Sequence, residues 1–232
     1  MATSCGSAEQ ISTGGTSVPL KSPRRAVTSD SEAAAGTRRY YDDNARIYSE
    51  ASVWLPLNDA FEPFVARLTA GARVLDLGCG AGRDLRALSL RGFRSIGLDV
   101  SLPLVELAAQ FSGCPVIQGD MRTIPFEDGA FGGIWASASL LHLRRREIPS
   151  AVREVVRVLA SGGYFFSSVK KGAGEGPDSK GRWFTYFEED EWLAVLADVG
   201  LAVVQSSATQ QASGTLEKNV SVDWFACITK KR

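Results

Sequence analysis

A chain of 232 residues can form one domain with a single large hydrophobic core and an appended segment. Because 26 Lys and Arg residues balance 26 Asp and Glu residues, the formal net charge is zero, which disfavours nucleic acids and acidic membranes as partners. The four cysteines contain no C-x-x-C pair, so neither a zinc site nor a disulfide framework is predicted. We expect reduced thiols, no metal and a cytoplasmic location, since no apolar run approaches the roughly 18 residues that cross a bilayer.

Residues 1–38 are rich in Ser, Thr, Gly and Ala and contain almost no large apolar side chains. Such a segment cannot offset its ordering entropy by burial, so we predict a disordered tail followed by one domain over residues 39–232. A transit peptide would also be Ser-rich and contain arginine, but Glu9, Asp30 and Glu32 count against it. No charged start followed by an apolar stretch indicates secretion.

From Tyr40 onward, short apolar runs alternate with amphipathic stretches, which indicates an α/β fold with a parallel sheet flanked by helices. The expected strands cover residues 73–77, 95–100, 115–118, 133–136, 163–169, 202–206 and 222–229. The expected helices cover residues 83–91, 104–111, 147–160 and 188–199.

The stretch "VLDLGCGAGRDL", residues 74–85, places Gly78, Gly80 and Gly82 directly after an expected strand. Glycines there allow a tight turn and a close approach of the backbone to a ligand. The G-x-G-x-G spacing differs from the G-x-G-x-x-G of a dinucleotide site. Asp76 would repel a pyrophosphate and suits a cationic ligand instead.

Two further acidic residues follow the next two expected strands. Asp99, in "GLDVS", lies about twenty residues after the glycine turn, where a carboxylate accepts hydrogen bonds from a ribose diol. Asp120, in "QGDM", can accept from an exocyclic amine, while the amide of Met121 can donate to a ring nitrogen of adenine. Three acids on the ligand-binding edge of an open sheet predict a cationic adenosine ligand.

The sequence resembles the class I S-adenosylmethionine-dependent methyltransferases, in particular bacterial enzymes that act on small molecules. Besides the motifs above, the resemblance rests on "GDMRTIPF", "FGGIWASASLLHL" and "VVRVLASGGYFF", and on the flanking "YYDDNARIYSEAS", "VKKGAGEG" and "GRWFTYF". The resemblance implies a three-layer sandwich around a seven-stranded, mostly parallel sheet whose last strand is antiparallel. It implies S-adenosylmethionine as cofactor, a small-molecule acceptor of the secondary-metabolite kind, in-line displacement, and a monomer or homodimer. A helical segment over residues 39–70 would cover the cofactor. The implied cofactor-binding residues are Asp76, Gly78, Cys79, Gly80, Gly82, Asp99, Val100, Asp120, Met121, Ala136, Tyr40 and Tyr48.

The acceptor end of the site is expected after the fourth strand and in the loop over residues 170–187. His142, the single histidine, is either a general base or a structural histidine. Arg182 can fork onto a carboxylate or phosphate, unless the loop is a mobile surface segment packed by its aromatic residues. For Tyr41 and Tyr48 the alternative is packing of an amphipathic helix. The candidate acceptor residues are Tyr41, Leu140, His142, Arg182, Trp183 and Tyr186.

Other functions remain open at this stage. The run Arg144–Arg146 could indicate RNA, although three arginines that open a helix are usually a solvated face. An RNA or protein methyltransferase, and a protein that keeps the cofactor but catalyses a cyclisation or only binds, are compatible with the same motifs. A dinucleotide-dependent oxidoreductase is disfavoured by Asp76 and by the glycine spacing.

Overall fold

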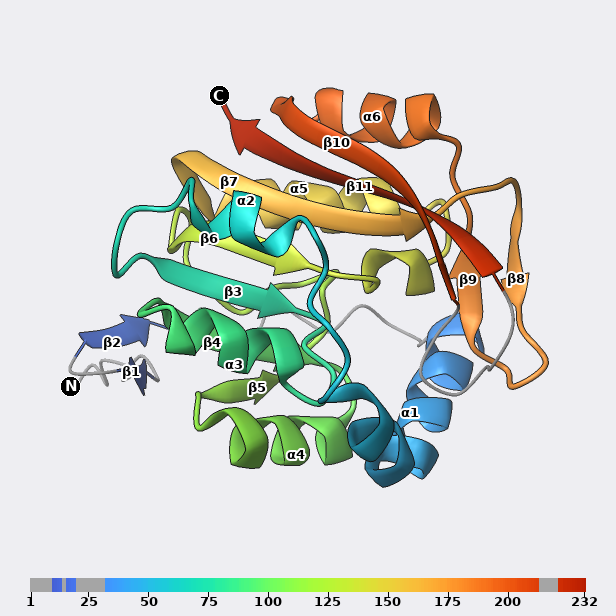
Figure 1. Cartoon of the computed structure of the whole chain (residues 1–232), viewed down its shortest axis with the longest axis horizontal. Coiled ribbons are helices and arrows are strands. Elements are labelled where there is room, and N and C mark those ends of the chain that lie inside the picture. The colour runs from blue at the N-terminus through green and yellow to red at the C-terminus, as the bar shows by residue number, and fades with distance from the viewer. Residues whose placement is uncertain (1–9, 14–15, 20–31, 213–220) are drawn as a thin grey trace, which may run out of the picture.

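The computed structural model describes residues 10–13, 16–19, 32–212 and 221–232, with side chains over residues 34–209 and 222–232. A seven-stranded sheet lies between two layers of helices (Figure 1). The strands of this sheet are β3 (Arg73–Leu77), β4 (Arg94–Asp99), β5 (Val116–Gln118), β6 (Phe131–Ala136), β7 (Leu159–Lys170), β10 (Leu201–Ala212) and β11 (Ser221–Lys231). The helices are α1 (Glu32–Ser52), α2 (Phe61–Val65), α3 (Arg83–Leu90), α4 (Leu102–Ser112), α5 (Ile148–Val158) and α6 (Glu189–Ala197).

The strand order is β10-β11-β7-β6-β3-β4-β5, in which β11 runs antiparallel to both of its neighbours. The strands from β3 to β7 are parallel, so their carboxyl ends meet at one edge of the sheet. This arrangement confirms the predicted mostly parallel sheet with an antiparallel last strand. It also places the residues after β3, β4 and β5 side by side, since Leu77 pairs with Leu98 and Asp99 pairs with Gln118.

Alternating side chains of the central strands form two apolar layers, one on each face of the sheet. Val74, Trp135 and Phe166 pack beneath α2 and α3 in one cluster. Leu75 and Phe165 belong to the other cluster, which α5 and α6 cover. Each central strand is therefore buried on both sides, as a parallel sheet in an α/β protein requires.

Three segments differ from the sequence prediction. The helix expected over 147–160 ends at Val158, because Leu159 already has extended backbone (φ −79°, ψ 130°) and begins β7. The loop expected over residues 170–187 contains a hairpin of β8 (Glu175–Pro177) and β9 (Trp183–Thr185). A short 3-10 helix, η1 (Leu140–His142), follows β6.

The boundary of the tail predicted at residue 38 falls too late, because α1 begins at Glu32. Within the tail, β1 (Gln10–Thr13) and β2 (Thr16–Pro19) pair as antiparallel strands. Residues 1–9, 14–15 and 20–31 of the predicted tail lie outside the described residues. Cys79, Cys114 and Cys227 are buried free thiols, and Cys5 is not described. No helix within the described ranges has the length and apolarity needed to cross a membrane.

Helix α1 is the element that closes the site. Near its middle, Ala45, Tyr41 and Tyr48 pack with Ala81 and Leu104, which tie α1 to the glycine turn and to α4. Near its start, α1 contacts the β8–β9 hairpin, beside which it lies in Figure 1. The helix thus connects the glycine turn and α4 with the β8–β9 hairpin.

Candidate active site

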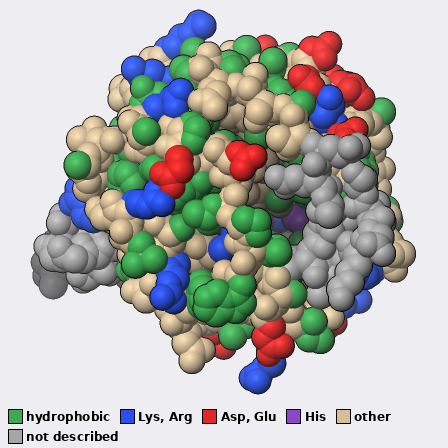
Figure 2. All heavy atoms as spheres, in the orientation of Figure 1, with side chains coloured by type: hydrophobic (Ala, Val, Ile, Leu, Met, Phe, Trp, Pro, Cys, Tyr) green, Lys and Arg blue, Asp and Glu red, His purple; other side chains and the backbone are tan. Residues whose placement is uncertain are grey.

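A cavity of about 900 Å³ lies at the carboxyl ends of the parallel strands. Its floor comes from the segments after β3, β4, β5 and β6, and its cover comes from α1, residues 55–59 and the loop that carries Arg182. Figure 2 shows a hollow on this face of the molecule, with the histidine side chain visible inside it. Of the predicted site residues, the cavity is lined by Asp76, Gly78, Cys79, Gly80, Asp99, Val100, Asp120, Met121, Tyr41, Tyr48, His142 and Arg182.

The glycine turn has the left-handed backbone that its composition predicts, with φ of +75° at Gly78 and +53° at Gly80. A Cβ at Gly78 would lie 2.4 Å from the Cβ of Ser139, and one at Gly80 would lie 3.3 Å from the Tyr48 ring. The absence of side chains at Gly78 and Gly80 therefore leaves space in the cavity next to the backbone of the turn. Gly82 has a different role, because a Cβ there would meet Ala108 of α4 at 3.0 Å, and the residue does not line the cavity.

Asp99 ends β4 with its carboxylate fixed by the backbone. Its Oδ2 accepts the N–H of Gly80 at 2.8 Å, and its Oδ1 accepts the N–H of Ser101 at 3.0 Å. Burial raises the pKa of Asp99, and these hydrogen bonds oppose the increase. A carboxylate oxygen accepts more than one hydrogen bond, so Asp99 can still receive two hydroxyl groups of a ligand.

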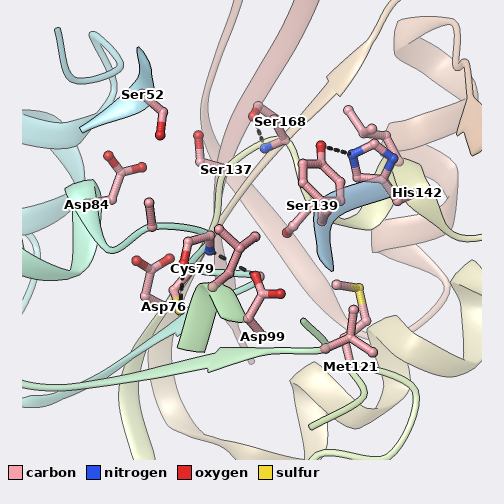
Figure 3. A pocket seen from close by; sticks show the side chains of 18 of the residues that line it. Ser52, Asp76, Cys79, Asp84, Asp99, Met121, Ser137, Ser139, His142 and Ser168 are labelled. Carbon is pink, nitrogen blue, oxygen red and sulfur yellow. Dashed lines mark hydrogen bonds between the residues drawn. The ribbon is translucent and has the colours of Figure 1, made fainter. Parts of the chain in front are cut away.

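Asp76 and Asp84 are two buried carboxylates on the same side of the cavity (Figure 3). Asp84 pairs with Arg83 at 2.6 Å and accepts the indole N–H of Trp135 at 2.8 Å. The Oδ2 of Asp76 is buried with no hydrogen-bond partner among the described residues. Burial, followed by the charge of Asp84, raises the pKa of Asp76 well above its usual value. Such an arrangement favours a ligand that brings positive charge or donors.

Asp120 and Met121 line the cavity beyond β5. The Asp120 carboxylate is also held by Arg122, whose Nε lies 2.9 Å from Oδ2 and whose Nη1 lies 2.9 Å from Glu147. Sequence reasoning missed Arg122, Arg83 and Asp84. The only local signal was the position of these charged residues directly after two of the ligand-binding turns.

At the other end of the cavity, His142 lies between two polar groups. Its Nδ1 is 2.7 Å from the carbonyl oxygen of Trp183, and its Nε2 is 3.1 Å from the hydroxyl of Tyr41. Burial lowers the pKa of His142 to about 4; Arg182 and Lys170 add to the decrease, and the bond to Trp183 opposes it. The imidazole is therefore neutral at neutral pH.

Ser139 follows β6 and was not predicted. The preceding residue, Ala138, has a φ of +53°, which is strained for a residue other than glycine, and its N–H donates to the Ser168 hydroxyl at 2.9 Å. The buried Ser139 Oγ lacks a hydrogen-bond partner among the described residues and lines the cavity. It is thus available to a ligand.

The remaining predicted site residues lie outside the cavity lining. Ala136 and Leu140 are in the core. Arg182 does line the cavity, but its guanidinium pairs with Asp178, so the carboxylate that it binds belongs to its own loop. The guanidinium also lies 4.8 Å from the centre of the Tyr40 ring and hydrogen-bonds the Tyr41 side chain. The backbone carbonyl of Tyr186 accepts a hydrogen bond from the Arg145 guanidinium. Trp183 contributes its backbone, because its N–H donates to the Thr37 hydroxyl at 2.8 Å.

Comparisons with known proteins place this site in context. Residues 75–167 match the family model described as "Methyltransferase domain". The uncharacterized methyltransferase YcgJ of Bacillus subtilis is 33% identical over 132 residues, which cover 54% of this chain and 51% of that protein. The probable tRNA methyltransferase 9B of Mus musculus is 37% identical over 94 residues, which cover 40% of this chain and 20% of that protein.

Among solved structures, the 1,6-didemethyltoxoflavin-N1-methyltransferase of Burkholderia thailandensis, crystallised with 1,6-didemethyltoxoflavin and S-adenosylhomocysteine, is similar with a TM-score of 0.69. It is 19% identical, and the alignment covers 97% of this chain and 100% of that one. This likeness establishes the fold. The chain spans about half of YcgJ and a fifth of the mouse protein, so whole-protein activities do not follow from those matches.

Proposed function

We propose that the chain is a class I S-adenosylmethionine-dependent methyltransferase that methylates a small-molecule acceptor. The match over residues 75–167 and the fold support this proposal. The observation that carries this proposal is one cavity that extends from the acidic residues of the glycine turn, past Ser139, to an end containing Tyr41 and His142. The two ends suit a nucleoside and an acceptor placed next to each other.

The residues at the glycine-turn end fit S-adenosylmethionine, whose positively charged sulfur makes its methyl group an electrophile. The unpartnered Oδ2 of Asp76 suits its cationic groups, and the fixed carboxylate of Asp99 suits the ribose diol. Gly78 leaves the space that a Cβ would fill, which lets the ligand lie against the backbone. Asp120 and the amide of Met121 would recognise adenine.

The cavity also supports a small acceptor. Ligand pockets occupy roughly 300–1,000 Å³, and this one is near the upper end, which leaves room for a second small molecule beside the cofactor. The cover supplied by α1 would exclude water during the reaction. Two arginines of the lining are paired within the chain, Arg83 with Asp84 and Arg182 with Asp178, which weakens any field that would attract a polynucleotide.

Two measurements test this function. Isothermal titration with S-adenosylhomocysteine is expected to give a dissociation constant in the micromolar range, on the order of −8 kcal/mol. Incubation with methyl-labelled S-adenosylmethionine and separated cell fractions is expected to transfer label to the low-mass fraction. Label confined to RNA or protein would contradict the small acceptor, and failure to bind the nucleoside at millimolar concentration would contradict the cofactor.

A further inference from the structure

Three groups from three different elements form one hydrogen-bonded chain at the acceptor end of the cavity. The carbonyl of Trp183 in β9 contacts Nδ1 of His142 in η1, and Nε2 of His142 contacts the hydroxyl of Tyr41 in α1. Tyr41 and His142 both line the cavity, whereas the carbonyl of Trp183 stands behind them. The two rings meet edge to face, with centroids 5.6 Å apart.

The chemistry of these groups fixes the positions of the hydrogens. A carbonyl oxygen only accepts, so Nδ1 of His142 must carry the hydrogen of the neutral imidazole. Nε2 is then a lone-pair acceptor, and the hydroxyl of Tyr41 must donate to it. With its hydrogen directed at His142, the oxygen of Tyr41 has only lone pairs to offer. Arg182 donates to one of them, which leaves the other for a ligand in the cavity.

We propose that Tyr41 Oη accepts the hydrogen of the acceptor atom and that His142 acts through Tyr41, so that the acceptors are molecules with an O–H or aromatic N–H group on a neutral atom. This inference rests on the proposed function and names the acceptor class and the residue that contacts it. In it, Tyr41 is the catalytic residue, His142 is the terminal proton acceptor, and the Trp183 carbonyl is a positioning group.

The proton transfer balances as follows. A lone pair of the neutral acceptor atom forms the bond to the methyl carbon, and the electrons of the broken carbon–sulfur bond stay on sulfur. The acceptor atom then carries a positive charge together with its hydrogen. That hydrogen passes to Tyr41 Oη while the phenolic hydrogen of Tyr41 passes to His142 Nε2, which leaves a neutral product, a neutral tyrosine and an imidazolium.

The low basicity of His142 is compatible with this role. Once methylated, an O–H or aromatic N–H acceptor is a strong acid, so an imidazole with a pKa of about 4 still removes its proton. The imidazolium also replaces the positive charge that the pocket loses when the sulfonium becomes a thioether. By contrast, a carboxylate or thiolate acceptor has no hydrogen to give, and the pair would do nothing for it.

The alternative, in which His142 contacts the acceptor directly, requires a free nitrogen on the imidazole. Both of its nitrogens are engaged in the structure, one by Trp183 and the other by Tyr41. A purely structural pair would explain the contacts, but it would not explain why both side chains line the same cavity. The experiments below separate these readings.

The first experiment needs no acceptor. Because the chain has one histidine, a ¹⁵N spectrum of protein carrying no histidine tag contains a single imidazole. We expect the wild-type spectrum to show the Nδ1–H tautomer. In Tyr41→Phe the tautomer should be retained, and the Nε2 resonance should shift towards the value of an imidazole nitrogen that accepts no hydrogen bond. Tyr164→Phe, a half-buried tyrosine outside the cavity, is the matched control and should change neither signal. An Nε2–H tautomer, or an unchanged spectrum in Tyr41→Phe, would overturn the proposal.

The second experiment uses the acceptor identified by the labelling assay. Tyr41→Phe is expected to lower kcat about 100-fold with little change in KM. His142→Gln keeps an oxygen that accepts from Tyr41 but cannot take up a proton, so it should lower kcat as well; a purely positioning role would leave its kcat near normal. Wild-type kcat retained in Tyr41→Phe, or an acceptor that is already an anion without N–H or O–H, overturns the inference. Absence of any small acceptor would instead contradict the proposed function, while the spectrum still reports on the pair.

Discussion

Asp76 shows how a single buried residue can trade stability for binding. Its carboxylate has an unpartnered oxygen and lies near Asp84, so its pKa in the folded chain is raised above the unfolded value. The stability that this group contributes is therefore present at acid pH and is lost as the pH rises through the raised pKa. At neutral pH, which lies above the unfolded pKa, holding this carboxyl in its buried site destabilises the empty protein.

We expect Asp76→Asn to raise the melting temperature of the ligand-free protein at neutral pH, by roughly 2–4 °C for each kcal/mol relieved, with a smaller gain in acid. The same change should weaken S-adenosylhomocysteine at least about tenfold, because the cationic end of the ligand loses its partner. Calorimetry and titration measure the two effects. Asp43→Asn, at an exposed position of α1, is the control and should show neither. A less stable Asp76→Asn protein would refute this account.

At the residue scale, the sequence predicts what is encoded locally. Asp76, Gly78 and Asp99 stand at fixed positions after strands, so their common location follows from strand order alone. The ion pairs of the neighbouring charged residues could not be predicted, because neither is marked by a local pattern. Arg83 pairs with the adjacent Asp84, and Arg122 pairs with Glu147, which lies 25 residues further along the chain. The pairing of Tyr41 with His142 joins residues 101 positions apart and has no local signal.

At the level of elements, α1 and the β8–β9 hairpin must fit together closely for the site to be covered. A Cβ at Gly36 would lie 2.8 Å from the carbonyl oxygen of Gly181. Gly36→Ala should therefore separate the two elements, even though alanine is favoured over glycine in a helix by about 1 kcal/mol.

The expected result of Gly36→Ala is faster hydrogen exchange of the amides in the first half of α1, because loss of docking outweighs the gain in helix propensity. Mass spectrometry of peptides from α1 measures it. Gly176→Ala in β8 adds the same methyl group where nothing lies within 4 Å, so its exchange should match the wild type. Slower exchange in Gly36→Ala would show that propensity alone governs this helix.

The elements of the central sheet were predictable, whereas the cover was not. Strand β3 has its predicted bounds because a buried apolar run ends at a glycine turn. The β8–β9 hairpin has the Gly, Pro and charged residues of a loop, and it forms because Phe184 and Thr185 are buried against the rest of the protein. Such tertiary contacts override local composition.

At the scale of the whole molecule, the balance of charge bears on the choice of acceptor. The net charge is zero, and the Arg144–Arg146 run is largely engaged, since Arg145 pairs with Glu191 and donates to the Tyr186 carbonyl, while Arg144 lies 5.3 Å above the Trp183 ring. We expect no tRNA complex tighter than about 10 µM at physiological salt, measured by filter binding. Submicromolar binding that weakens steeply with added salt would instead favour a polynucleotide acceptor.

The peptide unit of Trp183 has a consequence for timing. Its N–H is held by Thr37 of α1, and its carbonyl fixes the tautomer of His142. Displacement of α1 would remove this contact from the strand that orients the imidazole and would take Tyr41 away from His142. The hydrogen-bonded chain from Trp183 to Tyr41 would therefore be complete only while α1 covers the site, which would limit transfer of the methyl group to water.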